Sequence, residues 1–297
     1  MDNLNSHILK TLALFDIFSR PLTDFEIWQY LTVPASYSEV RRVLENNEVN
    51  FNLENQYGFF YLPNRSDIIE TRRQRYSETD KKLKIAQRRL LLISWLPWIK
   101  LICLANNIGS RNIRREGDLD LFIITSANRI WLTKLLTTTI LALSGLRPTE
   151  KRFQNKLCLS FLVDETKLNL ESILLSDDPY VPCWLAGLMP LRGDWNVYLK
   201  LMDNNPWLKE SLPNLVYPEA ASKYFIQSRI RKSPKNSFNF LEVLAKKFHK
   251  KIMSKKILSQ AGQGSSVIIE DHIIKLHTED RREKFREALK ERLQKYA

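Results

Sequence analysis

The chain has 297 residues, of which 44% are hydrophobic and 27% charged, and this composition excludes a fibrous or low-complexity protein. Its length fits two or three domains, and the excess of lysine and arginine (46) over aspartate and glutamate (33) gives a net charge of +13. The cysteines and histidines form no CxxC pair and no zinc-type spacing, which argues against a disulfide scaffold and a structural zinc site. No apolar stretch reaches the roughly 20 residues that span a bilayer, and no export signal opens the chain. We therefore expect a cytoplasmic protein without a membrane partner.

The N-terminal region has the pattern of a winged-helix domain. Apolar spacing predicts a helix over residues 6–18, a second over 25–31 and a third soon after it. Residues 49–62 alternate loosely, which predicts a hairpin with its turn at 54–56. A domain of this kind usually reads DNA through its third helix. Residues 1–65 contain eight acidic and five basic residues, however, which favours partner docking or substrate orientation.

The middle of the chain predicts short buried strands around a long helix. A charged helix over residues 66–93 is a natural connector between domains. The predicted strands that follow span 99–105, 118–125 and 156–163, and a Leu-rich helix spans 129–146. Beyond residue 170 the pattern is mostly helical and is interrupted by prolines, among them those at positions 179, 182, 190, 206, 213 and 218.

The most informative stretch is the second of these strands, which opens with Asp118, Leu119 and Asp120. Residues i and i+2 of a strand point to the same face, so the two carboxylates are predicted to lie within about 5 Å of each other. Like charges so placed repel each other unless a cation lies between them. Mg²⁺ prefers one or two carboxylates, with waters and substrate phosphates as its other ligands. The alternative is a strand entry with two solvated acids.

The loop before this strand, residues 106–117, is rich in glycine, serine, asparagine and arginine. Backbone N–H groups of such a loop can bind a triphosphate, particularly at a helix N-terminus. Arg111, Arg114 and Arg115 add positive charge. The loop and the aspartate pair therefore predict a phosphate site next to a metal site.

This combination resembles the signature of the DNA polymerase β-like nucleotidyltransferase superfamily: a strand that ends in Gly-Ser, a loop of about ten residues, and Asp-hydrophobic-Asp on the next strand. The chain is similar in particular to bacterial and archaeal nucleotidyltransferase-domain proteins of unassigned substrate. The similar segments lie at residues 15–31, 129–132, 156–168, 178–191 and 205–214. The resemblance implies a winged-helix start that is joined to a catalytic domain.

The phosphate-binding Gly-Ser pair can be placed in two registers. Gly109 and Ser110 are such a pair, but only seven residues separate them from Asp118, which requires a shortened loop. At the spacing of the superfamily, Asn106 and Asn107 occupy the Gly-Ser positions and no deletion is needed. Asparagine tolerates left-handed backbone better than most residues, so phosphate contact can survive there.

A third carboxylate of the superfamily belongs in the middle of the later strand. Residues 157–163 contain Cys158 and Ser160 but no acid, and Asp164 and Glu165 come only at the strand end. The site is therefore predicted to have two carboxylates.

The resemblance implies a nucleotidyltransferase that moves NMP from an NTP to an acceptor hydroxyl, such as that of RNA. Asp118 and Asp120 would be its catalytic residues and its ligands for Mg²⁺ or Mn²⁺. The residues implied in nucleotide binding are Asn106, Asn107, Gly109 and Ser110. The alternative is a catalytically degenerate nucleotide- or RNA-binding protein of the same fold.

Positive charge concentrates in residues 221–260, which contain eleven basic residues and Glu242 as the one acid. Lysine and arginine that neutralise phosphates supply most non-specific nucleic-acid affinity, so this segment predicts RNA binding with strong salt dependence. The alternative is the solvated face of a surface helix, because apolar residues recur here at helical spacing.

Together these patterns predict an α+β protein. Its expected parts are a winged-helix-like domain (1–65), a connector helix (66–95), a small mixed-sheet nucleotidyltransferase core (96–175), and a helical C-terminal region (176–297) with the basic segment 221–260. The resemblance covers most of the chain, whereas only the Asp-Leu-Asp context is chemically specific.

Overall fold

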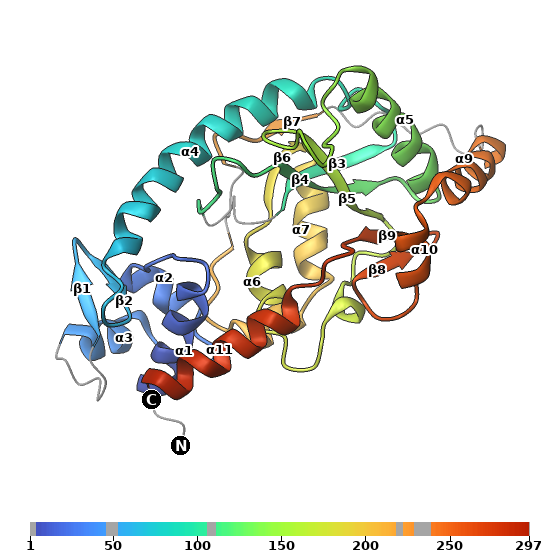
Figure 1. Ribbon diagram of the computed structural model, residues 1–297. Coiled ribbons are helices and arrows are strands. Elements are labelled where there is room, and N and C mark those ends of the chain that lie inside the picture. Colours follow the sequence, from blue (N-terminus) through green and yellow to red (C-terminus); the bar gives the residue numbers. More distant parts are fainter. Residues whose placement is uncertain (1–3, 46–52, 106–110, 218–221, 229–238, 297) are drawn as a thin grey trace.

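The computed structural model describes residues 4–45, 53–105, 111–217, 222–228 and 239–296 (Figure 1). Within these ranges the chain is an α+β protein built on one mixed seven-stranded sheet with helices on both faces. A two-stranded hairpin near the N-terminus lies apart from this sheet. None of the described helices is both long and apolar enough to cross a bilayer.

The predicted strands form the centre of the large sheet. In spatial order the sheet consists of β7 (Ile226–Gln227), β6 (Met189–Gly193), β3 (Ile99–Leu104), β4 (Leu119–Thr125), β5 (Leu157–Asp164), β9 (Ile273–Leu276) and β8 (Val267–Ile269). β4 pairs antiparallel with β3 and parallel with β5. The helix α5 (Ile130–Leu143) makes the crossover that parallel neighbours require. The predictions of these three strands and of the Leu-rich helix are confirmed.

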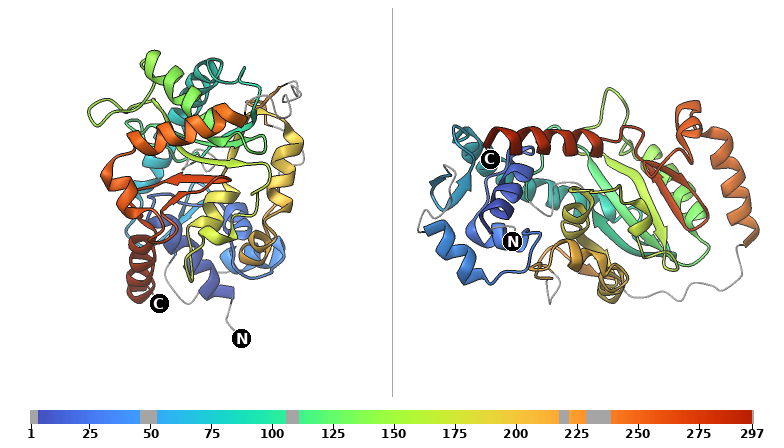
Figure 2. Two further views of the ribbon diagram at one scale, coloured as in Figure 1. Left: turned by 90° about the vertical axis from the view of Figure 1, so that its right-hand side faces the viewer. Right: turned by 90° about the horizontal axis from the view of Figure 1, so that it is seen from below.

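The two faces of the sheet carry separate apolar cores, and helices cover both faces (Figure 2). The helices on one face are α4 (Asp67–Leu90), α5 and α9 (Asn239–Ile252), and those on the other are α6 (Val181–Ala186), α7 (Trp195–Asp203) and α8 (Trp207–Ser211). Successive residues of β4 alternate between these cores: Leu121 packs under α5, and Phe122 packs against Trp184 of α6. This alternation decides which face of the sheet carries Asp120.

The region from residue 176 onward contains helices, as predicted, but it also supplies four strands of the sheet, so the prediction of a purely helical region is wrong. β6 and β7 extend the sheet beyond β3, and β9 and β8 extend it beyond β5. Each of the four has only two to five residues, which is too short for alternation to stand out in a sequence. The helices α10 (Lys255–Gln260) and α11 (Arg282–Tyr296) and a 3₁₀ turn (Glu171–Ile173) lie in the same half of the chain.

The N-terminal elements come in the predicted order of three helices and a hairpin. They are α1 (Leu4–Asp16), α2 (Asp24–Gln29), α3 (Tyr37–Glu45), β1 (Glu54–Gln56) and β2 (Phe59–Tyr61). The predicted turn at 54–56 is wrong, since these residues form β1. The turn lies at Tyr57 and Gly58, whose positive φ values of 55° and 76° suit a two-residue hairpin.

The C-terminal helix α11 returns to these N-terminal elements and completes their core (Figures 1 and 2). Leu289, Leu293 and Tyr296 of α11 pack into the cluster that contains Ile8 and Leu12 of α1. The long charged helix α4, which confirms the prediction for residues 66–93, runs from this unit to the sheet. The helices α4 and α11 therefore both connect the sheet to the N-terminal unit.

Candidate metal centre and its cavity

Asp118 and Asp120 lie where β4 begins, at the centre of the sheet. Oxygen atoms of the two carboxylates and the Sγ atom of Cys158 all lie within 4.8 Å of one another. Leu119, between the two acids, is fully buried in the core on the opposite face. The prediction that the two aspartates share one face is confirmed.

The β4–β5 ladder positions Cys158. In its parallel register Asp120 pairs with Cys158 and Phe122 pairs with Phe161, so β5 has one more residue than β4 between these pairs. This irregularity is a β-bulge, and it keeps Phe161 on the same face as Phe122, where the two rings lie 5.0 Å apart. Cys158 therefore stands opposite Asp120 in the strand where the superfamily resemblance places a third carboxylate.

The surroundings of this cluster disfavour negative charge when no cation is bound. Partial burial raises the pKa of Asp118, although Lys82 and the Cys158 thiol oppose the shift. Burial, together with the charges of Asp120 and Asp118, raises the pKa of Cys158. Lys82 is a buried residue of α4 whose Nζ donates a hydrogen bond to the carbonyl of Gly117, the residue before Asp118. A cation between the carboxylates would relieve their repulsion.

Asp164 does not supply the third carboxylate. It is fully buried at the opposite end of β5 from Cys158. Its carboxylate accepts hydrogen bonds from the backbone N–H groups of Asn128 and Thr166 and contacts Nδ1 of His272 at 2.8 Å. Asp164 therefore holds together the loops that follow β4 and β5, at the end of these strands away from Asp118.

Asp118 and Asp120 line a cavity of about 480 Å³ between the sheet and the N-terminal unit. Three aromatic rings from distant parts of the sequence meet on its wall. The ring centroid of Phe285 lies 5.0 Å from that of Phe18 and 5.2 Å from that of Tyr180, and Phe18 and Tyr180 lie 6.0 Å apart. Burial and the charge of Asp120 raise the pKa of Tyr180, so its hydroxyl stays protonated at neutral pH.

Hydrogen bonds hold the N-terminal wall of the cavity beside the aspartates. Asn112, a buried residue of the loop before β4, donates from Nδ2 to the carbonyl of Phe18 at 2.9 Å. Arg75 of α4 donates both to this carbonyl (2.7 Å) and to Oδ1 of Asn112 (3.0 Å). Three parts of the chain therefore meet here: the loop before β4, the turn that follows α1, and the helix α4.

Lys275 of β9 and His277, which follows this strand, line another wall of the cavity. Lys275 is buried, and burial lowers its pKa to about 8. Its Nζ donates to the carbonyl of Ser265 at 2.5 Å. His277 lies beside the ring of Phe161, and burial lowers its pKa to about 4, so that it is neutral at pH 7. The cavity thus has the Asp118 and Asp120 carboxylates on one wall and, on another, the amine of Lys275 close to the carboxylate of Asp280.

Asn106, Asn107, Gly109 and Ser110 lie outside the described residues, so neither register of the phosphate loop is tested. The last described residue before them is Ala105, whose N–H donates to the carbonyl of Asp120 at 2.9 Å. The chain therefore enters this loop directly beside the aspartate pair.

Sequence reasoning missed the cavity wall. Asn112, Tyr180 and Phe285 carry no local pattern that relates them to the Asp-Leu-Asp motif, and only the tertiary fold brings them to it. Across the whole chain, no family model, curated protein or solved structure is found to match.

Proposed function

We propose that this chain is a metal-dependent nucleotidyltransferase that transfers NMP from an NTP to an acceptor hydroxyl. The observation that supports the proposal is the convergence of the Asp118 and Asp120 carboxylates at the edge of a cavity of about 480 Å³. This volume falls within the range of small-molecule sites, roughly 300 to 1,000 Å³. Two carboxylates on one face leave coordination positions open for substrate phosphates.

The donor set fits Mg²⁺ or Mn²⁺ through its two carboxylates. Asp118 and Asp120 offer hard oxygen ligands, whereas the Cys158 thiol is a poor ligand for Mg²⁺. When bound, the ion would neutralise phosphate charge and orient the triphosphate for displacement of pyrophosphate.

The other residues of the cavity have roles in binding. The ring cluster of Phe18, Tyr180 and Phe285 offers an apolar, aromatic surface for a nucleobase. Lys275 offers positive charge for an anionic group that does not contact the ion. The loop that begins after Ala105 would bind phosphate through its backbone, in whichever of the two registers applies.

RNA as the acceptor remains a prediction. The described parts of the basic segment are residues 222–228 and 239–260, and the second of these meets the rest of the protein where α5 begins, after the C-terminal end of β4. Asp118 lies at the other end of this seven-residue strand, about 20 Å away. RNA bound to residues 239–260 would therefore need to extend along the sheet to reach the aspartates.

A second function is supported by Cys158. A thiol opposite Asp120 leaves the cluster with two carboxylates, which fits a protein that binds a nucleotide without turning it over. The two functions differ in turnover and not in nucleotide binding.

The test combines metal binding, nucleotide binding and label transfer. Mn²⁺ binding is measured by electron paramagnetic resonance, and transfer is measured with each labelled NTP, Mg²⁺ or Mn²⁺, and total cellular RNA. Asp118→Asn and Asp120→Asn are expected to lower Mn²⁺ affinity and transfer by more than about a hundredfold. Both variants should fold, because removal of one like charge relieves repulsion.

The matched control is Asp203→Asn, an exposed aspartate at the end of α7, which should change neither quantity. Binding of Mn²⁺ and NTP without transfer would favour the degenerate protein. Absence of binding to both would refute the two functions together.

A further inference from the structure

One side of α9 holds this helix on the protein. Ala245 and His249 are buried against α5. The carboxylate of Glu242 accepts hydrogen bonds from the backbone N–H groups of Trp131 (2.7 Å) and Leu132 (3.0 Å), so it caps the first turn of α5. Glu242, the one acid of residues 221–260, is therefore turned toward α5 and does not neutralise the lysines on the outward side of α9.

The outward side of α9 is apolar. Leu241, Leu244, Phe248 and Ile252 recur at intervals of three and four residues, and Phe248 and Ile252 are 51% and 55% exposed. Phe240, at the start of the helix, is 73% exposed. Seven of the eighteen strongly exposed large hydrophobic side chains of the described residues lie on α9 or α10. This concentration marks an interaction surface, which we call the α9 face.

Lysines border this apolar stripe. Lys247, Lys250 and Lys251 are exposed and have no acidic partner among the described residues, whereas Lys246 pairs with Asp271 at 2.6 Å. Two more lysines open α10. The α9 face therefore combines exposed hydrocarbon with uncompensated positive charge.

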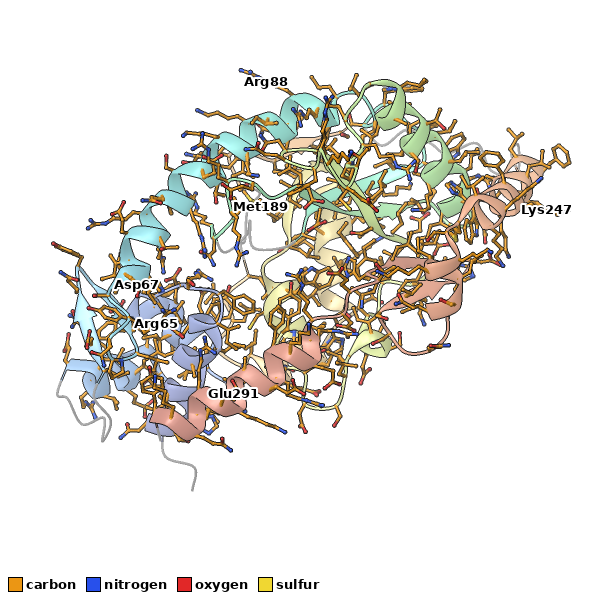
Figure 3. The ribbon with its side chains drawn as sticks, in the orientation of Figure 1. Arg65, Asp67, Arg88, Met189, Lys247 and Glu291 are labelled. Atoms are coloured by element: carbon orange, nitrogen blue, oxygen red, sulfur yellow. The ribbon has the colours of Figure 1, made fainter. Side chains whose placement is uncertain are left out.

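The position of the α9 face suits a flat partner. Figures 1 and 3 place α9, with Lys247, at the end of the molecule opposite the N-terminal helices. The face protrudes, so it cannot enclose a ligand. It also lies at the opposite end of β4 from Asp118, so a partner there leaves the cavity free.

We propose that the α9 face binds the surface of an anionic lipid bilayer, with α9 lying in the plane of the headgroups. Such a surface accepts the apolar stripe at the acyl boundary and pairs the lysines with lipid phosphates. A second copy of the chain would place lysines against lysines. RNA would pair with the lysines but would leave the Leu and Ile side chains in water. The expectation of no membrane partner rested on the lack of a spanning segment, and a helix that lies on a membrane needs none.

The experiment is co-sedimentation with phosphatidylcholine vesicles, with and without phosphatidylglycerol. The wild-type protein should bind only the anionic vesicles, and less at high salt. Neutralising Lys247, Lys250 and Lys251 together to Gln should weaken binding by about fivefold per lysine. Leu244→Ser with Phe248→Ser should weaken it by about tenfold or more, because the stripe no longer enters the acyl boundary.

Matched controls carry the same changes elsewhere. Lys284→Gln, Lys290→Gln and Lys295→Gln on α11, and Leu199→Ser on α7, should leave vesicle binding unchanged. The proposal is overturned if the wild-type protein does not co-sediment with anionic vesicles, or if the Leu244→Ser and Phe248→Ser changes do not weaken vesicle binding. It is also overturned if the Lys247, Lys250 and Lys251 changes weaken binding of an RNA oligonucleotide but not of vesicles, or if the protein dimerises through this face in light scattering. Circular dichroism establishes that each variant is folded.

Discussion

Cys158 sets the charge and the number of oxygen ligands that the Asp118 and Asp120 site offers a metal ion. A thiol gives Mg²⁺ a poor ligand, yet its Sγ atom occupies space within 4.8 Å of both carboxylates. Because the thiol is neutral at pH 7, the centre holds at most two negative charges. A carboxylate in its place would add a third charge and a third oxygen ligand.

We therefore predict that Cys158→Asp raises Mn²⁺ affinity by about tenfold or more and lowers the stability of the metal-free protein. Electron paramagnetic resonance measures the affinity, and thermal unfolding with and without Mn²⁺ measures the stability. Cys158→Ser, of similar size and neutral, is the control and should change neither strongly. An unchanged affinity in Cys158→Asp would mean that position 158 does not contribute to the centre.

Among the elements, α2 shows how a cap can join separate parts of the fold. Thr23 and Glu26 form a capping box at the start of α2, in which Thr23 Oγ1 accepts from the N–H of Glu26 and Glu26 Oε2 accepts from the N–H of Thr23. The same carboxylate pairs with Arg20 at 2.6 Å and with Arg72 of α4 at 2.7 Å. The cap therefore also holds the connector helix on the N-terminal unit.

This network predicts a pH dependence of stability. Burial opposes ionisation of Glu26, but Arg20 and Arg72 outweigh it and lower its pKa from 4.5 to about 2. A lowered carboxylate pKa stabilises the folded state above pH 4.5, and this contribution is lost as the pH falls from 4.5 to about 2. The contribution is at most about 3 kcal/mol at neutral pH. Urea unfolding of the wild type and of Glu26→Gln should show this difference at neutral pH and its loss near pH 2.

The control for this prediction is Glu39→Gln on α3. Glu39 is exposed and, within the described part of the chain, its carboxylate accepts hydrogen bonds from Ser36 alone, so its loss should have a smaller effect. Equal pH profiles for the wild type and Glu26→Gln would show that the ion pairs do not stabilise the fold.

At the scale of the whole molecule, the two ends of the chain are joined through Asp16. Its carboxylate is buried and accepts hydrogen bonds from Nε of Arg65, just before α4, and from Nε of Arg292 of α11, each at 2.7 Å. Phe18 and Phe285, which follow α1 and begin α11, meet on the cavity wall. Loss of this junction would therefore change the cavity as well as the stability.

We predict that Asp16→Ala lowers the free energy of unfolding by about 3 kcal/mol, since it leaves two partly buried guanidinium groups without a partner. Limited proteolysis should cleave before α11 more readily in this variant, and nucleotide affinity should fall. Arg41→Ala, which breaks an exposed pair with Glu45 on α3, is the control and should cost less than about 1 kcal/mol. A similar loss of unfolding free energy in both variants would show that the Asp16 junction stabilises the fold no more than an exposed ion pair does.

The sequence by itself determined the elements whose pattern is local. The helix α4 follows from its run of charged residues, and the strands β3, β4 and β5 follow from short apolar runs. The shared face of Asp118 and Asp120 follows from the strand period of two. The side chains of such segments must face a core or water, whatever packs against them.

Only the tertiary structure decided the features that depend on distant partners. β6 to β9 are too short to have a pattern of their own and exist because β3 and β5 offer them free edges. The pairing of Cys158 with Asp120 depends on the β4–β5 register and its bulge, which no single strand encodes. The cavity wall joins Phe18, Tyr180 and Phe285 because α11 packs on α1. Such contacts depend on burial between segments that lie far apart in the chain, and the spacing of residues within one segment carries no information about them.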